Sequence, residues 1–113
     1  MRNGLFSLII GFAGSISFGL SAVTVDFNRN IRPVLSRNCF ACHGPDEKAR
    51  KADLRLDVRE GAITERKGVP AVLPGNREKS ELFARITTAD SGDRMPPEES
   101  GHELTLEEID KIG

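Results

Sequence analysis

Residues 39–44 read Cys-Phe-Ala-Cys-His-Gly (CFACHG), and they include both cysteines of the 113-residue chain. The two thiols are three positions apart, and an imidazole follows the second one directly. On a helical turn this spacing puts Cys39 and Cys42 near one face, with His43 next to them. The chemistry of this motif decides what the rest of the chain folds around.

Four interpretations of the motif compete. A thioredoxin-type disulfide needs βαβ units, and no strand pattern is present. Structural zinc needs four ligands, and the fourth candidate, His102, is distant in sequence. Chance proximity leaves the imidazole unexplained. Covalent c-type haem explains every part, with Cys39 and Cys42 forming thioethers, His43 as proximal iron ligand and Gly44 leaving room for the ring.

A second axial ligand, Met or His, is common in haem proteins that transfer electrons. Beyond residue 22 the chain has one methionine, Met95, and one further histidine, His102. Pro96 and Pro97 stiffen the backbone after Met95. The charged residues near Met95 in the sequence argue against a place in the core. Met95 is therefore the stronger candidate, with His102 or an open position that binds a small ligand as alternatives.

The N-terminus has the layout of a secretory signal peptide over residues 1–22. Arg2 provides the positive start, residues 5–20 are uncharged, and small residues follow. The apolar stretch is short for a membrane span, so an uncleaved anchor is the weaker alternative. We expect cleavage after Ala22 and one exported domain at 23–113, in the periplasm or another extracytoplasmic space, where haem c is attached.

The composition after residue 22 argues for a small core. Arg2 is lost with the signal peptide, which leaves 15 basic and 17 acidic residues and a net charge of −2. This balance gives no reason to expect nucleic acid or an anionic membrane as partner. Only Phe27, Phe40 and Phe83 remain as aromatic residues. We expect a thin core that a buried cofactor completes.

Apolar spacing predicts several short helices joined by long loops. The first covers 27–35, with Asp26 as cap and Pro33 marking either a kink or a late start. The last begins at Thr105, which forms a capping box with Glu108. Two more are expected between them, a single turn over 57–62 and a longer helix within 77–90. No strand alternation is visible, so the expected fold class is all-α.

Haem propionates would need donors. Arginines at four positions are candidates for this role, although solvated surface charge is the more common role for each: Arg32, Arg50, Arg55 and Arg94.

Three stretches of the sequence resemble the Planctomycete-type cytochrome c domain: "VDFNRNIRPVLSRNCFACHGPDEKARKADLRLDVREGA", "VLPGNREKSELFARI" and "DRMPPEESGHELTLEEID". Together they span nearly all of 25–112. The resemblance implies a small, all-α, class I-like cytochrome c fold around one covalent haem. It also implies that Cys39 and Cys42 attach the haem, His43 is the proximal ligand and Met95 the distal one.

The expected function is electron transfer by a carrier that is not itself an enzyme. The alternative is a haem-based sensor or an accessory haem domain of a larger exported enzyme, and a disulfide-stabilised domain without cofactor ranks third. Expected partners are other redox proteins or a fused catalytic domain. We expect neither nucleic acid as a partner nor a membrane span after signal cleavage.

In the family, the last helix normally continues with an apolar stretch that contains an aromatic residue and packs on the first helix. The sequence here ends at Gly113. The resemblance therefore implies a shortened C-terminal helix, and we expect a lower melting temperature than that of a chain extended by such a stretch. Equal melting temperatures in a thermal scan of the two chains would contradict this.

Overall fold

The computed structural model describes residues 11, 13–19 and 24–113. The predicted signal peptide, 1–22, lies largely outside the described residues. The helices and strands of the described part are, in order, η1 (Phe27–Ile31), α1 (Arg32–Asn38), α2 (Arg59–Ile63), β1 (Glu65–Arg66), β2 (Val69–Pro70), η2 (Arg77–Lys79), α3 (Glu81–Thr87), η3 (Glu98–Ser100) and α4 (Leu106–Ile112). Among them, no helix has the length and hydropathy that a membrane crossing requires.

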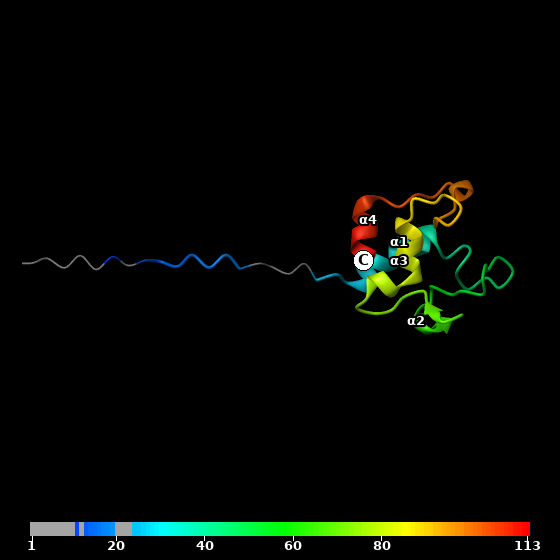
Figure 1. Ribbon diagram of the computed structural model, residues 1–113, viewed down its shortest axis with the longest axis horizontal. Coiled ribbons are helices and arrows are strands. Elements are labelled where there is room, and N and C mark those ends of the chain that lie inside the picture. The colour runs from blue at the N-terminus through cyan, green and yellow to red at the C-terminus, as the bar shows by residue number, and fades with distance from the viewer. Residues whose placement is uncertain (1–10, 12, 20–23) are drawn as a thin grey trace, which may run out of the picture.

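The first helix begins as a short π-helical segment, η1, and continues as α1 (Figure 1). The carboxylate of Asp26 accepts a hydrogen bond from the N–H of Arg29 at 3.0 Å, which confirms the predicted cap. Pro33 lies in the first turn of α1, where its missing N–H costs no helical hydrogen bond. Of the two predicted outcomes at Pro33, the late start of the α-helix is the one observed.

A two-stranded antiparallel ribbon, β1–β2, follows α2, although the sequence predicted no strand. Glu65 pairs with Pro70 and Arg66 with Val69. Lys67 and Gly68 form the connection, and both have positive φ, 53° and 83°. Such a two-residue connection matches the right-handed twist of paired strands. Two residues per strand are too few for visible alternation, so the protein is helix-rich with a small ribbon rather than free of strands.

The C-terminal half is built from α3 and α4, which pack against each other, and α4 also contacts η1 (Figure 1). Thr105 Oγ1 accepts from the N–H of Glu108 at 3.1 Å, and the Glu108 carboxylate accepts from the N–H of Thr105 at 3.0 Å. The predicted capping box is therefore confirmed. The same Glu108 side chain pairs with Arg37 of α1, which joins the first and last helices.

The core is thin, as the composition indicated. Among the described residues the buried apolar side chains are Val34, Leu35, Leu56, Ala71 and Ile86. Within the same residues, no large side chain is completely excluded from solvent. These few side chains come from α1, α3 and two loops. The buried apolar area is accordingly small for a chain of this length.

The capping box provides a test of the fold. We expect Thr105→Ala to lower the free energy of unfolding by about 1 kcal/mol, because the N–H of Glu108 in the first turn of α4 loses its side-chain partner. Chemical denaturation measures this change. Thr105→Ser keeps the hydroxyl and is the matched control. Equal stability of Thr105→Ala and the parent chain would show that the capping hydrogen bond of Thr105 contributes nothing to folding.

Candidate functional site

The motif lies in the turn that directly follows α1. The N–H of Cys39 donates to the carbonyl of Leu35 at 2.7 Å, and the carbonyl of Cys39 accepts from the N–H groups of Cys42 and His43 at 3.2 and 2.8 Å. One turn of chain therefore carries Cys39, Cys42 and His43 as near neighbours along the backbone.

The two thiols are free and differ in their surroundings. Burial raises the pKa of Cys39 to about 11, because a thiolate loses hydration there. Cys42 is exposed. A thiol that stays protonated at neutral pH is a poor reagent for thiol–disulfide exchange. Cys39 therefore lacks the reactive thiolate of a redox enzyme.

His43 is the most unusual side chain of the turn. Its Nδ1 is buried without a hydrogen-bond partner among the described residues. The pKa of His43 is lowered, chiefly because burial disfavours the imidazolium; the carbonyls of Lys51 and Leu54 oppose this shift, and the charge of Arg66 adds to it. The ring is therefore neutral near pH 7 and has a lone pair to donate, which is the state that an iron ligand requires.

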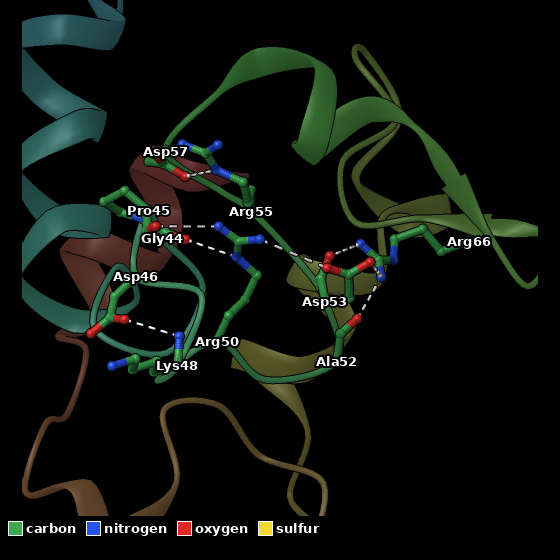
Figure 2. Close-up of polar contacts among 10 residues, drawn as sticks. All are labelled: Gly44, Pro45, Asp46, Lys48, Arg50, Ala52, Asp53, Arg55, Asp57 and Arg66. Carbon is green, nitrogen blue, oxygen red and sulfur yellow. Dashed lines mark hydrogen bonds and ion pairs between the residues drawn. The ribbon is translucent and has the colours of Figure 1, made fainter.

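The four consecutive carbonyl groups from Cys42 to Pro45 accept hydrogen bonds from one segment, residues 50–56, which we call the clamp segment. Two bonds come from its backbone: Lys51 N–H to Cys42 at 2.7 Å and Leu56 N–H to His43 at 2.8 Å. Two come from the Arg50 guanidinium: to Gly44 at 3.0 Å and to Pro45 at 3.3 Å (Figure 2). All four carbonyl groups from Cys42 to Pro45 thus have hydrogen-bond partners.

The clamp segment has an unusual backbone of its own. Ala52 and Asp53 have φ of 53° and 52°, a left-handed conformation that non-glycine residues rarely adopt. Arg66, on β1, donates from both terminal nitrogens of its guanidinium to the carbonyls of these two residues (Figure 2). The ribbon therefore holds the turn in this conformation from outside.

Gly44 is required by close packing. An added Cβ would lie 2.2 Å from the carbonyl oxygen of Phe40, and backbone atoms there cannot move aside. The tight turn between Phe40 and Gly44 therefore excludes any side chain at this position.

The two candidate distal ligands lie together. Met95 and His102 line one cavity of about 430 Å³, and apolar residues from α3, α4 and the loop between them line it as well: Ile86, Pro96, Leu104, Leu106 and Ile109. The N–H of Met95 donates to the carbonyl of Arg85 at 3.1 Å, which ties this loop to α3. The residues of the motif do not line this cavity. The predicted ligands therefore form two groups, one after α1 and one between α3 and α4.

The four arginines considered as propionate donors have partners within the protein. These are the Phe40 ring under Arg32, the carbonyls of Gly44 and Pro45 for Arg50, the Asp57 carboxylate for Arg55, and the carbonyls of Thr88 and Ala89 for Arg94. Sequence reasoning missed the roles of Arg50 and Arg66. No sequence pattern around Arg50 or Arg66 distinguishes these two residues from the other arginines of the chain.

Zinc finds no support in the arrangement of side chains. Within the described part of the chain, no three His, Cys, Asp or Glu residues are gathered as metal ligands. A structural zinc site needs four.

Comparison with known families decides between the interpretations of the motif. Residues 39–99, more than half of the chain, match the family described as Planctomycete cytochrome C. The chain belongs to this family. Membership in Planctomycete cytochrome C implies covalently bound haem, and a cytochrome c domain is generally an electron carrier rather than an enzyme. No curated protein and no solved structure matches the chain.

The motif of this Planctomycete cytochrome C member fits haem c in two respects. It has two free thiols three residues apart, and a neutral, partly buried imidazole follows the second one directly.

The close contact at Gly44 predicts a strong effect of a single methyl group. We expect Gly44→Ala to lower the free energy of unfolding by about 3 kcal/mol, since the clash is with the backbone and must displace the turn. Chemical denaturation of the haem-loaded chain measures this. Gly92→Ala is the matched control, because its Cβ would meet only the mobile end of Asp90 at 3.3 Å. Equal stabilities of the two variants would contradict the packing argument.

Proposed function

We propose that this chain is an exported, mono-haem electron-transfer domain of the c type. The observation that supports it is the turn after α1, where two free thiols and a neutral, partly buried imidazole stand in the order that haem attachment requires. The match to Planctomycete cytochrome C covers this turn and Met95.

In this proposal four residues hold the cofactor. Cys39 and Cys42 tether it through thioethers, and His43 donates its nitrogen lone pair as proximal ligand. Met95 is the distal ligand, and its thioether raises the reduction potential. When bound, the haem supplies the iron that gains and loses one electron. His43 and Met95 remain ligands in both oxidation states, so the protein makes and breaks no substrate bond.

The proposed fold is a cytochrome c-like arrangement of short helices and long loops around that haem. The thin core supports this, because a large apolar cofactor adds the burial that the side chains do not provide. The cavity at Met95 supports it as well, since apolar side chains of α3 and α4 line it together with polar ones.

The proposed place of action is the periplasm or another extracytoplasmic compartment, based on the signal-peptide layout of 1–22. The proposed partners are redox proteins or a fused catalytic domain. The chain has 16 basic and 17 acidic residues, which gives a net charge of −1. This balance gives no reason to propose nucleic acid as a partner.

A second candidate function is a haem-based sensor or accessory haem domain. The grouping of Met95 with His102, on a cavity that the motif residues do not line, favours it. A distal ligand that leaves the iron easily would open a position for a small molecule.

Absorption spectra of the exported, haem-loaded chain test the proposal. Electron transfer through His43 and Met95 predicts low-spin bands in both oxidation states and the weak long-wavelength band of a Met–Fe(III) bond. A high-spin spectrum that shifts on addition of carbon monoxide would instead establish the sensor. A chain that takes up no covalent haem would overturn both.

Met95→Ala separates the two functions further. If Met95 is the distal ligand, we expect this variant to become high-spin, to bind carbon monoxide and to have a lower reduction potential, because the thioether no longer favours Fe(II). His102→Ala is the matched control and leaves the spectrum unchanged. The reverse pattern would assign the distal position to His102.

A further inference from the structure

We propose that Arg50 and Arg66 are positioning residues for His43. In this view the two guanidinium groups hold the clamp segment and the motif in the one arrangement that presents the imidazole to the iron. The inference rests on the proposed function, since it concerns the ligand that the haem would use.

The first step concerns the His43 ring itself. A histidine that binds a metal usually donates its other ring N–H to a carboxylate or carbonyl, and this bond fixes the ring. Here Nδ1 forms no such hydrogen bond among the described residues. The carbonyls of Lys51 and Leu54 that act on the ring belong to the clamp segment, so the direction of the ring depends on where that segment lies.

The second step is the backbone on both sides of His43. The carbonyls of Cys42 and His43 are held by N–H groups of the clamp segment, and the next two carbonyls are held by Arg50. Leu56, which binds the carbonyl of His43, is itself in the core with 5% of its surface exposed. The position of His43 is thereby tied directly to the core.

The third step is the choice of arginine at position 50. Its side chain is only 13% exposed, and Nε and one terminal nitrogen reach two successive carbonyls at once. A planar guanidinium has this fork of donors, whereas a lysine ammonium offers a single point. Lysine would keep the charge, but all its donors lie on one nitrogen and do not reproduce this planar fork.

The fourth step connects Arg66 to the same unit. The left-handed turn at Ala52 and Asp53 brings the chain from Arg50 back toward Leu56, and Arg66 binds both carbonyls of that turn. The Asp53 carboxylate lies 3.8 and 3.9 Å from Arg50 and Arg66, and it is 88% exposed. Such exposed ion pairs contribute little. The carbonyl hydrogen bonds are therefore what hold the unit together.

The test uses the exported, haem-loaded full chain with Arg50→Lys, Arg66→Lys and both together. We expect Arg50→Lys to lower the reduction potential and to weaken the long-wavelength Met–Fe(III) band of the oxidised protein, because a looser turn admits water beside His43. Arg66→Lys shifts both in the same direction. The double variant shifts less than the sum, since both residues act on one turn. Arg77→Lys is the matched control, because Arg77 lies far along the chain from this turn, at Glu78 and Phe83, and it leaves both readouts unchanged.

The outcomes separate a positioning role from a structural one. All spectra are taken well below the melting temperature of each variant. A lower melting temperature with unchanged potential and unchanged band would overturn the inference while leaving the proposed function intact. A parent chain without haem, or without low-spin bands, would overturn the proposed function and this inference with it. If Arg50→Lys does not fold, the same criteria apply to Arg66→Lys.

Discussion

The fold depends on finding hydrogen-bond partners for the carbonyl groups that follow α1. A backbone that leaves a helix in a tight turn exposes several such groups, and buried ones must be paired. Here residues 50–56 pair the four carbonyls from Cys42 to Pro45. Because the same turn contains the two thiols and the imidazole, the pairing that stabilises the chain also shapes the candidate site. Structure and function therefore share one set of contacts.

That set of contacts matters more than usual because the core is small. Five buried apolar side chains among the described residues offer limited hydrophobic stabilisation, and polar contacts from arginines connect the loops instead. Arg37 links α1 to α4, and Arg66 links the ribbon to the clamp segment. Long loops in a small domain usually surround a ligand or cofactor. Membership in the cytochrome family implies that this cofactor is haem. The proposed iron ligands accordingly lie on loops.

Much of the local structure was predictable from the residues. The cap at Asp26, the late start of α1 at Pro33 and the capping box of α4 all followed from side chains within four positions of the groups that they serve. The haem interpretation of residues 39–44 followed from the spacing of the motif, and the family followed from the resemblance of three longer stretches, which the family match confirms. The ribbon was missed because two-residue strands leave no periodic pattern. The distal ligand and the signal peptide remain predictions.

By itself, the sequence determined the chemistry of this protein: which thiols and which imidazole stand together, because these residues are neighbours along the chain. Only the tertiary structure decided how that chemistry is held. Arg50 lies six residues from Gly44, and Arg66 lies thirteen from Asp53. Met95 and His102 share a cavity only because the loop that contains them folds between α3 and α4. Contacts of this kind depend on the path of the whole chain, and no local pattern encodes them.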